Sequence, residues 1–445
     1  MPTTDRIDPT RRRLLLGACL AVVLVLTACS GGSTRTPPSG RPIDTAVPVK
    51  LTWWTGQEAE AQKALEGLAK SFTAQHPNVT IDVSSGASTT EELLQKLSAT
   101  FLAGTYPDIS YAYGNWATEL ADSERMLDLT AVAAEPASAW QDFPASSRQT
   151  ATVRSKVIGF PAVVGNLGVI YNPTLFAAAG VPEPTADWTW EDFRVAAKQI
   201  TDPAKSIYGT AYSVSGSEDT TWHFWPLLWQ NGGSILSEDG KTSAFSSPAG
   251  VNGLELLCRM AVEDKSVYLD QTDEKYAPLF ASGRIGMMIN GPWTLYDLVQ
   301  AKTPYRVTVL PGTGGDHQTS SATDLWVGLD HGDSARGYWV GKFLQFLATP
   351  ASDQVWNLGQ GNLPLRPSEM TSPAFQQYVR DYPGADVFLA NLTTNAKHAK
   401  PTVSGYVELS GYVGKAVARV LQGAASPQQA LAEAAKQADQ ALADQ

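Results

Sequence analysis

The sequence predicts an α/β protein, because short apolar segments alternate with amphipathic helical segments along most of its length. Residues 58–75 place Leu65 and Phe72 on one face of a helix, and residues 90–102 repeat that pattern. Strand and helix in alternation favour parallel strands covered by helices. Strands are expected at 49–54, 79–83, 108–113, 167–171, 208–214, 284–290 and 305–311.

The C-terminal segment SPQQALAEAAKQADQALADQ predicts a long final helix. Ser426 suits the N-cap and Pro427 the first helical position, and a run of helix-forming residues follows. The chain has 445 residues, which is too long for one hydrophobic core, so we expect two or more domains.

Composition excludes several classes of function. Hydrophobic residues make up 43% of the chain and charged residues 17%, which is typical of a globular protein. The formal net charge of −11 argues against a nucleic-acid partner, because binding to phosphates requires clustered Lys and Arg. Only 5 histidines are present, so there are few candidates for metal ligands or for acid–base catalysis.

The N-terminus predicts export and lipid anchoring. Three arginines at 11–13 precede an apolar run from Leu14 to Leu26, which is too short to span a bilayer but suits a signal peptide. The following Leu-Thr-Ala-Cys resembles a bacterial lipobox, with Cys29 as the lipidated residue. Residues 1–28 are therefore expected to be a lipoprotein signal peptide, and residues 29–47, rich in Gly, Ser, Thr and Pro, a tether.

The stretch TTWHFWPLLWQNGG contains three tryptophans at helical spacing. Because Pro226 cannot lie deep in a regular helix, the helix is expected to begin close to it. Trp222 and Trp225 then fall on the entering loop or first turn, where a ligand is accessible, whereas Trp229 packs in the core.

Other candidate binding residues follow predicted strands, where α/β proteins bind their ligands. Trp293 lies in the compact turn Gly-Pro-Trp, and strand alternation lets at most one of Trp53 and Trp54 reach a ligand. Indole faces stack on sugar rings while amides and carboxylates bind hydroxyls, so this mixture predicts a carbohydrate site. The polar candidates are Gln57, Glu58, Asn115, Asn166, Asp219, Asp324 and Asn362, each of which also suits a helix cap or a turn.

Motifs of enzymes are missing from the sequence. It contains no GxSxG, no HExxH, no phosphate-binding loop and no Cys pair at metal-binding spacing. We therefore expect no enzyme activity, no catalytic residue, no metal and no cofactor. A pair of carboxylates for glycoside hydrolysis is a matter of spatial separation, so a secreted glycoside-processing enzyme stays an alternative.

Four segments together carry a family resemblance: TYPDISYAYGNW, VIGFPAVVGNLGVIYNPTLFAAAGVP, FASGRIGMMINGPW and FLQFLATPASDQVWNLGQGNLPLRPS. In this order they resemble the extracellular solute-binding lipoproteins of carbohydrate ABC importers, the maltose-binding-protein-like family. The resemblance extends from Val49 to the C-terminus. One position departs from many relatives, in which an acidic residue stands about where this chain has Val163.

The resemblance implies a two-lobed periplasmic-binding-protein fold with hinge-linked lobes. Lobe 1 would comprise 48–160 and 304–350, and lobe 2 would comprise 161–303 and 351–445. It also implies a monomer on the outer face of the bacterial cytoplasmic membrane, which captures a sugar and delivers it to permease subunits with a cytoplasmic ATPase. Carried over by motif, the ligand contacts are Trp54 or the turn of Gln57 and Glu58, together with Tyr113 to Asn115, Asn166, Trp222 to Trp225, and Trp293.

Two other ligand classes stay open at this point. Clustered tryptophans can enclose a quaternary ammonium group, and a glycerophosphodiester would require an arginine near the cleft, for which Arg366 is the one candidate. A role in cell-wall adhesion is a weaker alternative.

Overall fold

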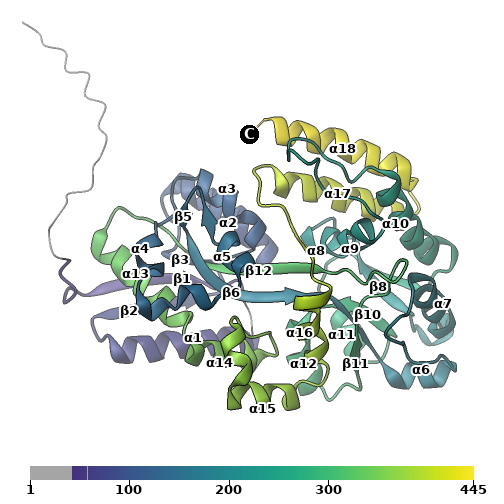
Figure 1. Ribbon diagram of the computed structural model, residues 1–445, viewed down its shortest axis with the longest axis horizontal. Helices are drawn as coiled ribbons and strands as arrows, with labels where there is room; N and C mark the ends of the chain where they lie inside the picture. Colours follow the sequence, from purple (N-terminus) through teal and green to yellow (C-terminus); the bar gives the residue numbers. More distant parts are fainter. Residues whose placement is uncertain (1–42, 58, 445) are drawn as a thin grey trace, which may run out of the picture. The chain divides into compact units, whose positions relative to one another are not determined.

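The computed structural model describes residues 43–57 and 59–444 (Figure 1). The predictions for the signal peptide, Cys29 and Glu58 lie outside the described residues, as does the tether up to residue 42. Within the described part of the chain, none of the helices combines the length and the apolar character needed to cross a membrane.

The larger sheet has six strands, in the order β13-β12-β3-β1-β2, with β6 also paired to β12. Strands β1, β2 and β3 are parallel, as predicted from the alternation of strands and helices, whereas β12 runs antiparallel to both β3 and β6. The strands are β1 (Val49–Trp54), β2 (Val79–Ser84), β3 (Ile109–Ala112), β6 (Gly159–Asn166), β12 (Ser320–Gly328) and β13 (His398–Ala399).

Three smaller sheets complete the strand structure, and β10 and β11 flank β7 in antiparallel pairing. Strands β8 and β9 pair in parallel, and β8 lies next to β10. The bounds are β4 (Thr152–Val153), β5 (Lys156–Val157), β7 (Gly168–Tyr171), β8 (Thr210–Ser213), β9 (Val267–Asp270), β10 (Met287–Asn290) and β11 (Arg306–Thr308).

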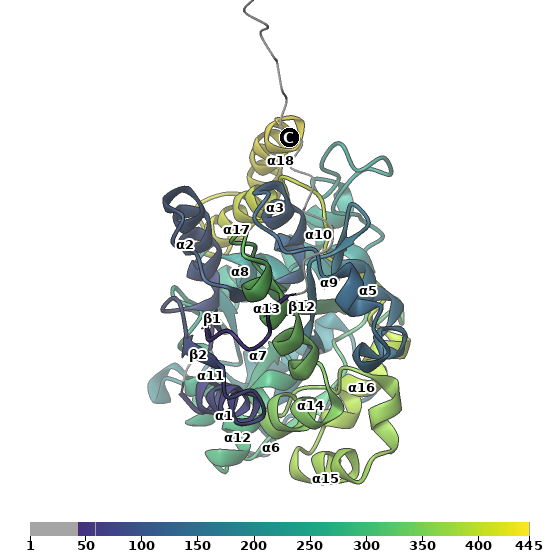
Figure 2. The same ribbon diagram turned by 90° about the vertical axis from the view of Figure 1, so that its left-hand side faces the viewer.

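Helices surround these sheets, and α17 packs along α18 at one end while α14, α15 and α16 lie at the other (Figure 2). The first half of the chain contains α1 (Ala59–Gln75), α2 (Thr90–Ala103), α3 (Ala117–Asp122), α4 (Thr130–Ala133), α5 (Ala145–Thr150), α6 (Pro173–Ala179), α7 (Trp190–Ile200), α8 (Glu218–Trp222) and α9 (Trp225–Gln230). The second half contains α10 (Pro248–Cys258), α11 (Tyr276–Ala281), α12 (Leu295–Gln300), α13 (Ser334–Leu347), α14 (Pro350–Trp356), α15 (Pro373–Asp381), α16 (Ala385–Thr394), α17 (Tyr406–Leu421) and α18 (Pro427–Ala443).

Two hydrophobic cores form within residues 43–444, and the long strands β6 and β12 run between them (Figure 1). The first core includes Trp53 and Phe72, and the second includes Trp225 and Tyr406. Helices α14 to α16 contribute Trp356, Phe375 and Phe388 to the first core, whereas α17 and α18 pack on the second. The lobe boundaries given above stay a prediction.

Local sequence signals located several elements correctly. Helix α18 begins at Pro427, and the Ser426 hydroxyl accepts a hydrogen bond from the backbone N–H of Gln429. Helix α9 begins at Trp225, directly before Pro226. The sequence patterns missed β6 and β12, because β6 is buried on both faces and so lacks the alternation that identifies a strand.

Candidate functional site

A cavity of about 250 Å³ lies between the two cores. Its wall includes Tyr111 and Trp356 from the first core and Trp222 from the second. The lining residues are mostly aromatic or capable of hydrogen bonding, which is the composition of a small-molecule site. They are Gln57, Thr90, Tyr111, Tyr113, Val163, Glu218, Asp219, Trp222, Trp293, Ala322, Asp324, Trp356, Asn362 and Lys400.

Trp293 is the most exposed tryptophan of this wall, with 41% of its surface accessible. It follows β10 in a short 3-10 helix, Pro292–Thr294. A Cβ atom at Gly291 would lie 2.1 Å from its indole ring, and one at Gly165 would lie 3.0 Å away. Two glycines therefore let the ring pack against backbone while leaving much of its surface free for a ligand.

Trp222 lies in α8 and is 6% exposed. The Lys400 ammonium lies 4.5 Å from the centre of the Trp222 ring and 5.3 Å from that of Tyr113. The same ammonium forms an ion pair with Glu218 at 3.1 Å, in which both side chains are 9% exposed. Glu218 also accepts hydrogen bonds from Ser410 at 2.5 Å and from Tyr406 at 3.3 Å, so this carboxylate is fully compensated.

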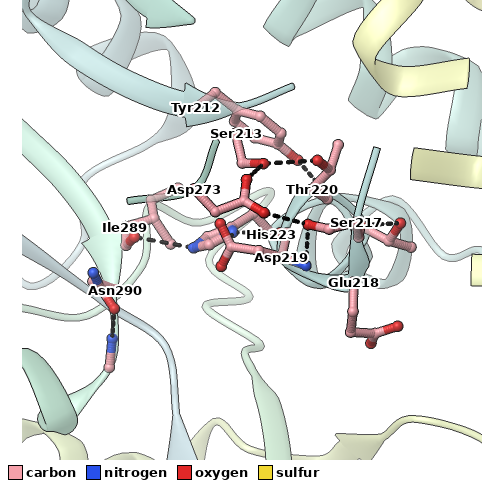
Figure 3. A network of polar contacts seen from close by, with 12 residues as sticks. Tyr212, Ser213, Ser217, Glu218, Asp219, Thr220, His223, Asp273, Ile289 and Asn290 are labelled. Atoms are coloured by element: carbon pink, nitrogen blue, oxygen red, sulfur yellow. Dashed lines mark hydrogen bonds and ion pairs between the residues drawn. The ribbon is translucent and has the colours of Figure 1, made fainter. Parts of the chain in front are cut away.

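Asp273 holds the loop that leads into α8 (Figure 3). Its carboxylate accepts hydrogen bonds from Ser213 at the end of β8, from Ser215 at 2.8 Å and from Ser217 at 2.7 Å. Ser217 in turn caps α8 by accepting from the backbone N–H of Asp219. This network fixes the position of Glu218 and Asp219 at the cavity.

Asp219 is the next acidic residue of α8, and a quarter of its side chain is exposed. Burial raises the pKa of Asp219 to about 6; His223 opposes that shift, and the carboxylates of Asp273, Asp270 and Glu218 add to it. Its Oδ1 atom lies 3.6 Å from His223 Nδ1, and Oδ2 has no hydrogen-bond partner among the described residues. Oδ2 is itself buried, so a ligand donor would reach this carboxylate through the exposed quarter of the side chain.

Asp324 faces the cavity from β12, where the pairing with β6 shifts register between Asp324 and Leu325. Bulges of this kind often redirect a side chain beside a binding site. The Asp324 carboxylate accepts hydrogen bonds from the Tyr111 hydroxyl at 2.8 Å and from the backbone N–H of Gly114 at 3.3 Å. Burial raises the pKa of Asp324, while the Lys400 ammonium opposes this shift.

Trp356 and Asn362 close the cavity from the α14 side. The Trp356 indole donates a hydrogen bond to the backbone carbonyl of Ala162 at 2.9 Å, which holds the ring against β6. Asn362 is 5% exposed, and its Oδ1 atom has no hydrogen-bond partner among the described residues. It is a second acceptor that a ligand hydroxyl can satisfy.

Several residues predicted from the sequence surround this cavity. The tryptophans Trp222 and Trp293 do so, although they are separated by about seventy residues of chain. The remaining predicted residues at the cavity are Gln57, Tyr113, Asp219, Asp324 and Asn362.

Other predicted contacts lie elsewhere and need correction. Trp225 is completely buried, and its indole N–H donates to the Tyr406 hydroxyl at 3.0 Å, so it stabilises the second core. Trp54 does not line the cavity, and the Lys96 ammonium lies over its ring. Asn166 donates to the backbone carbonyl of Phe388 at 2.8 Å, which fixes β6 against α16. Asn115 is buried and does not reach the cavity.

Sequence reasoning missed some residues of the wall. Lys400 lies in the segment between α16 and α17, which has no periodic pattern, and only long-range packing brings it to Glu218. Val163 lines the cavity. The position at which many relatives have an acidic residue is therefore an apolar part of the cavity wall in this protein. The other residues missed are Thr90, Tyr111, Glu218, Ala322 and Trp356.

Charge and metal-binding capacity limit the ligands that suit this site. Lys400 is the one cationic residue of the cavity wall among the described residues, and Arg366 lies apart from it, 2% exposed and stacked on Phe143. Searching the same described part of the chain finds no group of three or more His, Cys, Asp or Glu that could hold a metal ion.

Comparison with known proteins places this geometry in context. A lipoprotein of Streptomyces antibioticus from the oleD 5' region is 27% identical over 382 residues, covering 82% of this chain and 78% of its own. The ABC substrate-binding protein Lmo0181 from Listeria monocytogenes, solved with cycloalternan, superposes with a TM-score of 0.78 at 24% identity, over 88% of this chain and 99% of that one.

UgpB from Mycobacterium tuberculosis, solved with glycerophosphocholine, has a TM-score of 0.79 at 16% identity, over 89% of this chain and 98% of its own. These likenesses show that the fold is that of two-lobed ABC substrate-binding proteins. The model of the bacterial extracellular solute-binding protein family matches residues 55–354, which is well over half of the chain. This protein therefore belongs to the bacterial extracellular solute-binding protein family.

Proposed function

We propose that this protein captures a sugar or sugar derivative outside the cell and delivers it to the permease of an ABC importer. It binds its solute without chemical change, as a monomer held at the outer face of the cytoplasmic membrane. Lipid attachment at Cys29, after removal of residues 1–28, would provide the anchor. The likeness to a lipoprotein of Streptomyces antibioticus supports this part of the proposal.

The composition of the cavity wall is the observation that carries the proposal. The partly exposed ring of Trp293 offers a flat apolar face, onto which the C–H face of a pyranose can stack. Asp219 Oδ2 and Asn362 Oδ1 are buried acceptors without a hydrogen-bond partner among the described residues, which favours a ligand that brings donors into the cavity. Hydroxyl groups on an apolar ring meet both requirements.

A glycerophosphodiester is the second candidate, because the fold is also shared with a protein solved with glycerophosphocholine. A phosphate group brings negative charge and acceptors only. In this cavity it would face Glu218, Asp219 and Asp324, while Lys400 is already paired with Glu218. The balance of charge therefore favours a sugar over a phosphodiester.

The test is a thermal-shift screen of the purified protein against sugars, polyols and glycerophosphodiesters, with calorimetry on each hit. A ligand at about a hundred times its Kd stabilises the folded state by about 2.7 kcal/mol, which gives a readily measured rise in Tm. Trp293→Ala should weaken a sugar hit by about tenfold or more, with little change in the Tm of the free protein.

Trp54→Ala is the matched control, because Trp54 is a tryptophan of the same chain that does not line the cavity. It should leave affinity for the sugar unchanged. A response confined to glycerophosphodiesters would refute the sugar assignment and leave only the transport class. Equal losses in the two variants would show that Trp293 is not the stacking platform.

A further inference from the structure

The cavity wall carries more carboxylates than cations. Its charged residues are Glu218, Asp219, Asp324 and Lys400. Glu218 is neutralised by Lys400 at 3.1 Å, and both oxygens of Asp324 accept hydrogen bonds, from the Tyr111 hydroxyl and the Gly114 backbone. Neither Asp219 nor Asp324 has an ammonium or guanidinium partner, and of the two only Asp219 has a carboxylate oxygen that accepts no hydrogen bond among the described residues.

His223 is the basic side chain nearest to Asp219 among the described residues, and the shortest contacts of its two ring nitrogens are to backbone oxygens (Figure 3). Its Nδ1 lies 2.7 Å from the backbone oxygen of Asp219, and its Nε2 lies 3.0 Å from that of Ile289. The separation from the Asp219 carboxylate is 3.6 Å, longer than a hydrogen bond. Because a quarter of the Asp219 side chain is exposed, a ligand has access to it.

Lys400 shows how residues of this cavity wall bind an ammonium group. Its ammonium is held by a carboxylate at 3.1 Å and by the ring faces of Trp222 and Tyr113 at 4.5 and 5.3 Å. Charge-assisted pairing together with cation–π attraction stabilises an ammonium even when it is largely removed from water. Asp219 and Trp222 lie three residues apart on α8, and both line the cavity, so a carboxylate and an aromatic ring are also close to each other here.

We propose that the natural ligand carries a protonated amino group, as an amino sugar does, and that Asp219 binds this group within the cavity. This inference rests on the proposed sugar-binding function and names the class of sugar. Asp219 then acts as a specificity-determining residue, which selects aminated over plain hydroxylated rings.

Pairs of ligands that differ only in the amino group test the proposal. The probes are glucose with glucosamine, galactose with galactosamine, mannose with mannosamine, and cellobiose with chitobiosamine, in which an amino group replaces the 2-hydroxyl of each ring. Calorimetry at pH 7 should give an affinity about tenfold higher for the amino member, because an ion pair replaces a neutral hydrogen bond. N-acetylglucosamine, which is uncharged, should bind no better than glucose.

Two variants with the same change of charge locate the effect. Asp219→Asn should abolish the preference for the amino member. Asp324→Asn, whose carboxylate already has two donors, should weaken both members of a pair and, although the cavity becomes less negative, retain most of the preference.

The outcomes separate the two levels of the proposal. Equal or tighter binding of the neutral sugars would overturn the amino-sugar inference while leaving the sugar-binding function intact. A preference that survives in Asp219→Asn would overturn the role of Asp219. Failure of every sugar and amino sugar to bind would overturn both proposals.

Discussion

Two groups of charged side chains in this protein have similar composition and different surroundings. The cavity group comprises Glu218, Asp219 and Lys400, which line the open space between the cores. The enclosed group comprises Asp353, Arg366 and Glu369, which are 0%, 2% and 4% exposed within the first core. Each group contains two carboxyls and one cation.

The enclosed group compensates itself. Arg366 lies 3.6 Å from Glu369, its guanidinium stacks on Phe143 at 3.8 Å, and it donates to the backbone carbonyl of Ser138 at 3.3 Å. Burial, followed by the neighbouring carboxyl of Asp353, raises the pKa of Glu369 to about 9, so this residue is uncharged at neutral pH. Protonation of Glu369 lowers the negative charge that the Arg366 guanidinium has to balance.

The difference in charge compensation indicates which of the two groups needs a ligand. The enclosed group balances its charge through a protonated Glu369, whereas Asp219, whose raised pKa of about 6 lies below neutral pH, is mostly ionised and has no cation within hydrogen-bond distance. A buried charge without a partner lowers stability, and proteins tolerate such a cost chiefly at functional sites.

The largest expected effect is on the enclosed group. Arg366→Met should lower the free energy of unfolding by about 3 kcal/mol, because it leaves buried carboxyls without their cation. Denaturant titration measures this loss. Arg380→Met, on the exposed face of α15, is the control and should change stability by less than about 0.5 kcal/mol. If correctly folded Arg366→Met bound the ligand more weakly than the wild type, the enclosed group would contribute to ligand binding, and the distinction between the two groups would be wrong.

Removal of the cation from the cavity group should have a smaller effect. Lys400→Met keeps the aliphatic stem but leaves Glu218 without its ion pair, so we expect a loss of about 2 kcal/mol in the free energy of unfolding. The more negative cavity should also increase the preference for amino over neutral sugars. Lys397→Met removes an exposed lysine paired with Asp316 and should change neither property. An unchanged or reduced preference in Lys400→Met would argue against electrostatic selection.

The smallest effect concerns Asp219 in the free protein. Its pKa in the folded state is about 6, above the ordinary value of 3.8, so the wild type loses stability as pH rises through that interval. Asp219→Asn should therefore be more stable than the wild type by about 1 to 2 kcal/mol at pH 7, and this advantage should disappear near pH 4.

Chemical unfolding at the two pH values, without ligand, measures this advantage. Asp386→Asn, an exposed carboxylate on α16, serves as the control and should show neither the gain nor its pH dependence. A variant less stable than the wild type at pH 7 would show that the Asp219 carboxylate is already compensated in the free protein.

Much of the fold and part of the site were accessible to sequence reasoning. Helix α18, with its Ser426 cap, follows from neighbours within a few residues, as does the alternation of Trp53 and Trp54 in β1, although the sequence left open which of the two is buried. The turn after β10 marked Trp293, because proline and glycine there fix a compact turn at a strand end. The family resemblance was confirmed over residues 55–354.

Only the tertiary structure determines which of the candidate binding residues lie together at the cavity. Trp222 and Trp225 lie three residues apart in the sequence. Trp222 lines the cavity, whereas Trp225 donates a hydrogen bond to the Tyr406 hydroxyl in the second core. Lys400 reaches Glu218 across 182 residues of chain, and no local pattern encodes such a contact. Propensity, capping and periodicity act between residues close in sequence, whereas the cavity exists only because β6 and β12 bring two separate cores together.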